Sequence, residues 1–178
     1  MAAALLDAAA TMEALTPPGL PGEELLAKAE AENFPVALRL LPRDARAALE
    51  AVYGFARLVD DVGDLAPGDR LALLDWVAED LDRAYEGRAS HPLLRRLTPA
   101  LHEHDLPRDP FRRLIEANRV DQVRTRYETF PELVAYCHLS ADPVGELVLR
   151  VFDVATAERV HLSDNVCTAL QLAEHWQD

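Results

Sequence analysis

The sequence predicts an all-α protein, and three observations favour this class: its composition, its recurrent helical periodicity and its lack of alternating strand patterns. Hydrophobic residues make up 49% of the 178 residues, which excludes wholesale disorder. Alanine and leucine dominate, whereas aromatic residues amount to only 6%. Such a composition favours helices, and the chain is long enough for one domain with a substantial core.

Proline and glycine divide the chain into consecutive helical segments. A breaker cluster, TPPGLPG at 16–22, separates a short alanine-rich start from the rest, so we expect an N-terminal segment and linker at 1–22 and the main domain at 23–178. Asp44 is the expected N-cap of the longest helix. The predicted helices cover residues 23–32, 44–64, 69–86, 92–104, 110–126, 131–140, 143–153 and 156–178.

The charge balance limits the classes of partner. Lys and Arg number 18 against 31 Asp and Glu, so the formal charge is −13. An acidic chain argues against a nucleic-acid interface, which needs a basic face. No apolar run reaches the roughly 18–20 residues of a membrane span, and the N-terminus lacks the basic region of a secretory signal. We therefore expect a cytoplasmic protein with no nucleic-acid partner, one able to associate peripherally with a membrane.

The stretch AVYGFARLVDDVGD at 51–64 carries charge where a helix resists it. Asp60, Asp61 and Asp64 crowd the last turn, although a helix C-terminus repels anions by roughly 0.3–1 kcal/mol each. On a helix, Asp60 and Asp64 share one stripe with Tyr53 and Arg57. An apolar stripe on the opposite side contains Ala48, Val52, Phe55, Val59 and Val62.

Two interpretations of the polar stripe stay open on the pattern alone. It faces water, or it holds a divalent cation that turns the repelling carboxylates into ligands. Mg²⁺ is typically bound by one or two carboxylates together with phosphate oxygens and water. Arg57, one turn before Asp60, would then bind a phosphate.

A second polar stripe lies at the end of the chain, in QLAEHWQD at 171–178. Glu174 and Asp178 are four residues apart on one helix face, and Gln171 precedes them by one turn. Alone, this pattern is typical of an ordinary solvated face. Paired with the first stripe, it supplies carboxylates from facing helices, which is a recurrent way to build a metal site in a helical bundle.

Other candidate sites are weaker. His102 and His104 are two residues apart and point to different sides of a helix, so they do not favour zinc. His91 is expected at the surface or as a helix cap. Cys137 and Cys167 are expected to be reduced and buried.

Three segments carry a family resemblance. The run AENFPVALRLLPRDARAALEAVYGFARLVDDVGD at 31–64 resembles the squalene/phytoene synthase family, and its ENFPVA opening resembles the hopanoid-pathway branch of squalene or hydroxysqualene synthases. TRYETFPELVAYCHLSADPVGELVLRVF at 125–152 and VCTALQLAEHWQD at 166–178 match further on. The resemblance is colinear over about 23–178.

This resemblance implies an isoprenoid-synthase helical bundle, here partial, around a central apolar cavity. It implies an Mg²⁺-dependent transferase that ionises presqualene or farnesyl diphosphate and yields hydroxysqualene or squalene. By the same resemblance, the metal ligands are Asp60, Asp64, Glu174 and Asp178, the catalytic residues are Tyr53, Arg57 and Tyr136, and the substrate-binding residues are Phe34, Ala141, Val144, Gly145 and Gln171.

Two departures from the family pattern bear on function. Glu174 stands where relatives usually carry asparagine, and His175 stands where they carry an apolar residue. Relatives also continue beyond the position of Asp178, so we expect this chain to be truncated, with the remaining helices supplied by a partner chain. The alternatives are a non-catalytic helical module that binds a partner chain and a carboxylate metal-binding bundle without a diphosphate substrate.

Overall fold

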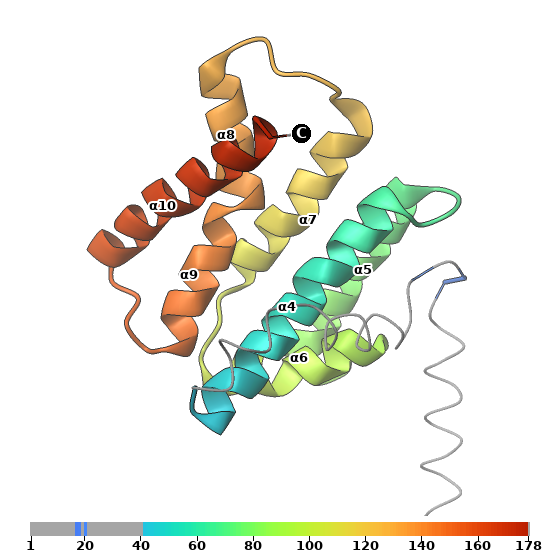
Figure 1. The fold of residues 1–178 in the computed structure, drawn as a ribbon. Coiled ribbons are helices and arrows are strands. Elements are labelled where there is room, and N and C mark those ends of the chain that lie inside the picture. The colour runs from blue at the N-terminus through green and yellow to red at the C-terminus, as the bar shows by residue number, and fades with distance from the viewer. Residues whose placement is uncertain (1–16, 19, 21–40, 178) are drawn as a thin grey trace, which may run out of the picture.

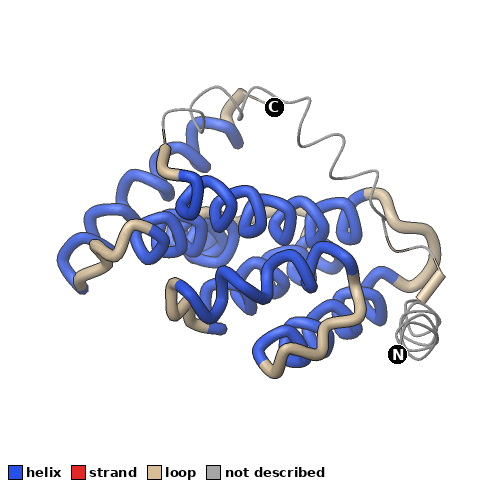
Figure 2. Tube along the Cα trace, turned by 90° about the horizontal axis from the view of Figure 1, so that it is seen from below, coloured by secondary structure: helices blue, strands red, loops and turns tan. Residues whose placement is uncertain are grey.

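The structure, a computed structural model, describes residues 17, 18, 20 and 41–177. Within these residues it contains seven helices and no strand (Figures 1 and 2). The helices are α4 (Arg43–Asp64), α5 (Arg70–Tyr85), α6 (Pro92–Glu103), α7 (Arg108–Val123), α8 (Phe130–Ser140), α9 (Asp142–Val151) and α10 (Ala157–His175). The predicted all-α class is confirmed. The helix predicted at 23–32, Phe34 and most of the segment at 1–22 lie outside the described residues.

The predicted boundaries of the described helices lie within three residues of those observed, and two of the differences have a clear cause. The predicted N-cap Asp44 is wrong, because α4 begins at Arg43 directly after Pro42 and no side chain caps it. The fixed φ of proline is already suited to a helix start, so Asp44 falls inside the first turn. Helix α7 ends at Val123 rather than at 126, because Arg124 is extended, with φ −117° and ψ 118°.

Helix α7 lies in the middle of the molecule. It packs against α4 and α5 on one side and against α8 and α9 on the other (Figure 1). Helix α6 covers α4 and α5, and α10 lies across α8 and α9. The C-terminal ends of α4, α7 and α10 all lie at the upper end of the molecule as drawn in Figure 1. Residues far apart in the sequence therefore meet at one end of the bundle.

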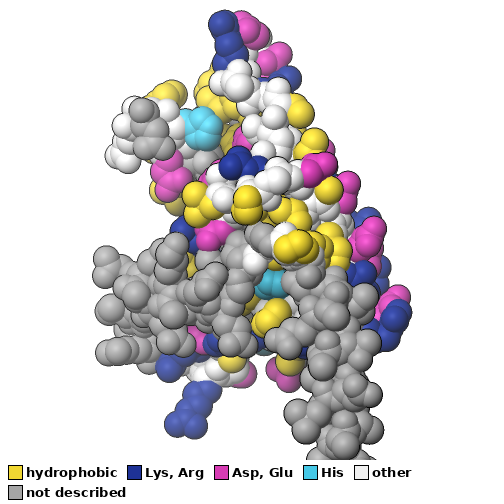
Figure 3. Space-filling view, turned by 90° about the vertical axis from the view of Figure 1, so that its right-hand side faces the viewer, with side chains coloured by type: hydrophobic (Ala, Val, Ile, Leu, Met, Phe, Trp, Pro, Cys, Tyr) yellow, Lys and Arg dark blue, Asp and Glu magenta, His cyan; other side chains and the backbone are white. Residues whose placement is uncertain are grey.

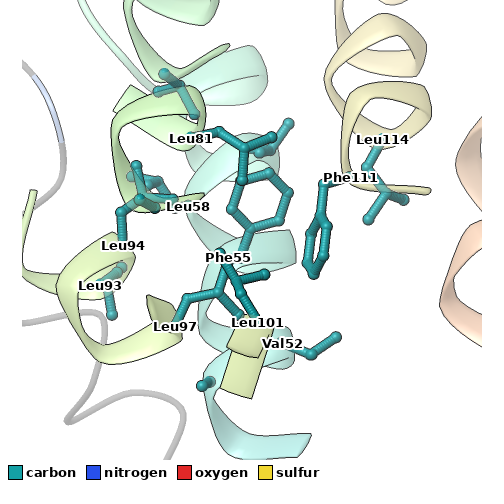
Figure 4. Close-up of a cluster of buried hydrophobic side chains, with 14 of the residues drawn as sticks. Val52, Phe55, Leu58, Leu81, Leu93, Leu94, Leu97, Leu101, Phe111 and Leu114 are labelled. Carbon is teal, nitrogen blue, oxygen red and sulfur yellow. The ribbon is translucent and has the colours of Figure 1, made fainter. Parts of the chain in front are cut away.

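The predicted apolar stripe of α4 is the centre of the core, and all five of its residues are buried. The ring of Phe55 meets that of Phe111 edge-on at 5.0 Å between centroids. Figure 4 shows leucines from α5 and α6, among them Leu81, Leu94 and Leu97, around Phe55. The apolar stripe faces α5, α6 and α7. The polar stripe therefore lies on the opposite side of α4.

A buried carboxylate joins α5 to the start of α6. Asp80 is fully buried, and its Oδ1 accepts hydrogen bonds from the Ser90 N–H and from Arg83 Nε, each at 2.8 Å. Its Oδ2 accepts from the His91 N–H at 2.8 Å. His91 is a helix cap as predicted, since its Nδ1 accepts from the Leu93 N–H, but it is buried rather than at the surface. Asp80 thus satisfies the backbone of the α5–α6 turn.

Helix α10 differs from the other helices in having no buried residue. Leu162, Val166 and Leu170, four residues apart, are 57%, 59% and 62% exposed and form an apolar stripe on its outer side. None of the described helices is both long enough and apolar enough to cross a membrane.

Candidate functional site

The polar stripe of α4 lies on one side of the helix, as predicted. Asp60 and Asp64 are exposed at its C-terminal end; Arg57 and Tyr53, one and two turns before Asp60, are half-buried. Exposure of the carboxylates agrees with both interpretations of the stripe. The residues that other helices place next to Asp60 and Asp64 must distinguish the solvated face from the metal site.

Asp61 differs from the two aspartates beside it. It is 5% exposed, and Arg57 Nε lies 3.2 Å from its Oδ1. A buried carboxylate needs such a partner, because an unpaired charge in the interior is costly. Asp61 is therefore a structural residue, and Arg57 is held in place one turn before Asp60.

Asn118 of α7 contacts Asp60 of α4. Its Nδ2 donates to Asp60 Oδ1 at 3.2 Å and also to the Leu114 carbonyl at 3.3 Å. The two helices approach closely at Gly63, where an added Cβ would lie 2.2 Å from Asn118 Oδ1. The Gly63 carbonyl accepts from Gln122 Nε2 at 3.0 Å. Glycine at this position lets the polar side chains of α7 reach the carboxylate end of α4.

Replacing Gly63 with alanine is expected to lower the free energy of unfolding by about 1 kcal/mol. Overpacking costs roughly 1–3 kcal/mol, and the better helix propensity of alanine recovers about 1 kcal/mol. Gly54→Ala in the same helix is the control, since its Cβ would meet Leu93 at 3.4 Å, an ordinary contact. Chemical denaturation measures both variants, and equal stability of the two would contradict the proposed close approach.

A carboxylate that the sequence analysis missed lies beside this end of α4. Asp121 of α7 is exposed, and its Oδ2 accepts a hydrogen bond of 2.6 Å from the hydroxyl of Tyr136 in α8. Asn118, Asp121 and Gln122 share one face of α7 at spacings of three and four residues, which was the signal available in the sequence. Asp121 thus holds the predicted Tyr136 within electrostatic range of the predicted Asp64 of α4.

The electrostatics of the site show crowded carboxylates. Desolvation by the surrounding protein raises the pKa of Asp60 although its side chain reaches solvent; the Asn118 hydrogen bond opposes this, and the charge of Asp64 adds to it. Desolvation likewise raises the pKa of Asp121, against the Tyr136 hydrogen bond, and the negative charge of Asp64 raises it further. Asp64 therefore repels carboxylates on both helices. A bound cation would relieve this repulsion.

Aromatic residues surround Asp121 on the side toward α10. The ring of Tyr136 lies 5.3 Å from that of Tyr127 and 5.8 Å from that of His175. Gln171 Nε2 is 3.5 Å from His175 Nδ1. Burial raises the pKa of Tyr127 to about 12 and that of Tyr136 still further. Both phenols are therefore neutral hydrogen-bond donors near neutral pH.

The second predicted metal motif is less complete. Glu174 is exposed near the end of α10, and Asp178 lies outside the described residues. In the described ranges, no group of three or more acidic, histidine or cysteine side chains is arranged to hold a metal ion. The four-carboxylate metal set therefore stays a prediction.

The predicted substrate-binding residues at 141–145 lie where α8 passes into α9. Ala141 precedes α9, and Val144 is 39% exposed. An added Cβ at Gly145 would lie 2.2 Å from Ser163 Oγ and 2.7 Å from Cys167 Sγ. Glycine here lets α10 pack closely on α9. Of the two free cysteines, Cys137 is buried as predicted and Cys167 is half-buried.

A separate groove of about 540 Å³ runs between α5 and α7 and contains none of the predicted site residues. Ion pairs line it, including Arg112 with Asp82 at 2.9 Å and Arg119 with Asp75 at 2.6 Å. Acidic and basic side chains are interspersed in the same way on the face drawn in Figure 3. The charges in the groove between α5 and α7 are paired with one another, so nothing in this groove points to a ligand.

The profile of the squalene/phytoene synthase family matches residues 27–178. The chain belongs to this family. It is 35% identical over 150 residues to a phytoene synthase of Mycobacterium tuberculosis, covering 83% of this chain and 49% of the relative. It is 37% identical to a hydroxysqualene synthase of Sinorhizobium fredii, covering 83% and 50%.

A solved member of the family shares the fold. The crystal structure of squalene synthase HpnC from Alicyclobacillus acidocaldarius superposes with a TM-score of 0.79 at 46% identity, over 90% of this chain and 64% of that one. This match confirms the predicted resemblance to the squalene and hydroxysqualene synthases. The chain spans about half the length of the curated relatives that it matches.

Proposed function

We propose that this chain forms part of a transferase that acts on prenyl diphosphates, ionising presqualene or farnesyl diphosphate with Mg²⁺ and yielding hydroxysqualene or squalene. The observation that carries the proposal is the crowding of polar and acidic groups at one end of the bundle: Asn118 of α7 donates to Asp60 of α4, and the charge of Asp64 acts on Asp121 of α7. Relatives of this chain are a hydroxysqualene synthase and a presqualene diphosphate synthase, which supports the substrate class.

The residues at this end of the bundle suit a metal–diphosphate complex. The carboxylates of two helices repel one another here. Carboxylate oxygens are also the ligands that Mg²⁺ prefers. When bound, Mg²⁺ stabilises the negative charge that develops on a departing diphosphate. Asp60 and Asp64 of α4 would hold the metal ion, and Asp121 of α7 would add negative charge beside it. Arg57 is paired with Asp61 through Nε, and its guanidinium carries two further nitrogens that can donate to a phosphate.

The apolar part of the site is proposed from the resemblance. A carbocation requires a dry, apolar and preorganised cavity. Its proposed lining consists of Phe34, Ala141, Val144, Gly145 and Gln171. The exposed apolar stripe of α10 (Leu162, Val166 and Leu170) is where we place the helices that complete the cavity, supplied by this chain or by a partner chain.

The deciding experiment is calorimetric titration of the chain with farnesyl diphosphate and with inorganic pyrophosphate, each in the presence and absence of Mg²⁺. We expect Mg²⁺-dependent binding that weakens at least roughly tenfold in the double variant Asp60→Ala, Asp64→Ala, since ligand-set changes cost this much in metal sites. The matched control is Asp75→Ala, Asp82→Ala, which removes two exposed carboxylates of α5.

Each contrary outcome favours a different function. Unchanged affinity in the α4 double variant would contradict the metal–diphosphate site. Tight stoichiometric Mg²⁺ binding without any diphosphate would favour a carboxylate metal-binding bundle. Failure of the wild-type chain to bind either diphosphate would favour the non-catalytic helical module.

A further inference from the structure

One buried carboxylate joins three helices on the side of the molecule away from α4. Asp142, the first residue of α9, is 1% exposed. Its Oδ1 accepts a hydrogen bond of 2.9 Å from the hydroxyl of Thr168 in α10. Its Oδ2 contacts Nδ1 of His138 in α8. Both carboxylate oxygens are thus used, each by a different neighbouring helix.

Helix α10 depends on this contact more than an ordinary helix would. Helices in globular proteins are held mainly by burial of an apolar face. No residue of α10 is buried; Leu162, Val166 and Leu170 point outward, whereas Val160 and Leu172 are half-buried. Where α10 packs against Gly145 of α9, its residues are the small Ser163 and Cys167. Such a smooth surface allows close approach but does not by itself select one register.

The position of α10 along its axis decides what reaches the carboxylate end of the bundle. Gln171 follows Thr168 by about one turn, and His175 follows by about two turns. The His175 ring contacts Tyr136, whose hydroxyl donates to Asp121. A slip of α10 by one residue would move each side chain by about 1.5 Å along the axis and rotate it by roughly 100°. The contact with Tyr136 would then be lost.

We propose that Asp142 is a positioning residue: by holding Thr168 from α10 and His138 from α8, it sets the register of α10 and so places Gln171, Glu174 and His175 relative to Tyr136 and Asp121. The inference rests on the proposed function only in assuming that the end of the bundle near Tyr136 and Asp121 binds the substrate. The geometry itself can be tested without any ligand.

The test compares Thr168→Val, which keeps the shape of the side chain and removes its hydroxyl, with Thr168→Ser, which restores the hydroxyl. Hydrogen exchange of backbone amides in the full chain reports the opening of each helix. Thr168→Val is expected to speed exchange in α10 about tenfold, the effect of losing one hydrogen bond to a charged group, and to leave α4–α6 unchanged. Thr168→Ser is expected to exchange as the wild type does.

The second readout is the NMR signal of the His175 imidazole, which senses the nearby Tyr136 ring. Thr168→Val is expected to shift this signal, and Thr168→Ser to restore it. Asn165→Ser, at an exposed position of α10 outside the apolar stripe, is the control and should move neither readout. Unchanged exchange in α10, or an unshifted His175 signal despite faster exchange, would overturn the proposal.

The two proposals fail in distinguishable ways. If the wild-type chain binds no Mg²⁺–pyrophosphate, the proposed function is contradicted, whereas exchange and the His175 signal still judge the role of Asp142. If binding is present and Thr168→Val changes neither readout, only the positioning role is overturned.

Discussion

Replacing Asp80 with alanine is expected to lower the free energy of unfolding by about 4 kcal/mol. The variant leaves the backbone N–H groups of Ser90 and His91 without their acceptor and removes the partner of Arg83 Nε. Each buried donor left unsatisfied costs roughly 1–3 kcal/mol. Because small domains are stable by only about 5–15 kcal/mol, the loss should be evident in thermal and urea unfolding of the chain.

Asp82→Ala is the matched control, since Asp82 lies two residues further along α5 and pairs with Arg108 and Arg112 at the surface. Exposed ion pairs contribute about 0–1 kcal/mol, so this variant should be almost as stable as the wild type. If the two variants lose the same stability, the hydrogen bonds of Asp80 do not hold the α5–α6 turn as described.

Replacing Asp121 with asparagine is expected to weaken Mg²⁺–pyrophosphate binding about tenfold at neutral pH, because a negative charge beside the proposed metal site is removed. The pKa of Asp121 is raised above its ordinary value of 3.8, chiefly by desolvation. The Asp121 carboxylate is therefore neutralised by protons at a higher pH than a freely solvated aspartate would be. As the pH falls through this raised pKa, the wild-type chain loses the negative charge of Asp121 and with it the tighter binding of Mg²⁺–pyrophosphate. The affinities of the wild type and the variant should then converge.

Asp109→Asn in the first turn of the same helix is the control, because its carboxylate is exposed and pairs with Arg113 away from the site. It should bind Mg²⁺–pyrophosphate as the wild type does at every pH. Protonation of pyrophosphate affects every protein equally at a given pH, so its effect cancels when the variants are compared at the same pH. An affinity ratio between wild type and Asp121→Asn that stays constant from neutral to acidic pH would contradict a contribution of the Asp121 charge to metal binding.

Local patterns in the sequence were sufficient for most of the fold. The apolar stripe on α4 predicted the buried face that meets Phe111 and the leucines of α5 and α6, because helical periodicity alone decides which residues share a side. The predicted N-cap Asp44 was wrong because capping depends on the backbone just before the helix, where Pro42 starts α4. The predicted end of α7 was late for a similar reason, since Arg124 leaves helical geometry.

The sequence by itself determined the all-α class, the membership of a synthase family and the stripe that contains Asp60 and Asp64, since each depends on residue order along one helix or one motif. Only the tertiary structure decided that Asp61 is buried against Arg57, that Asp121 lies beside the α4 carboxylates and that Asp142 holds α10. The physical reason is that burial and electrostatic coupling arise between helices. Spacing along a single helix carries no record of which other helix packs against it.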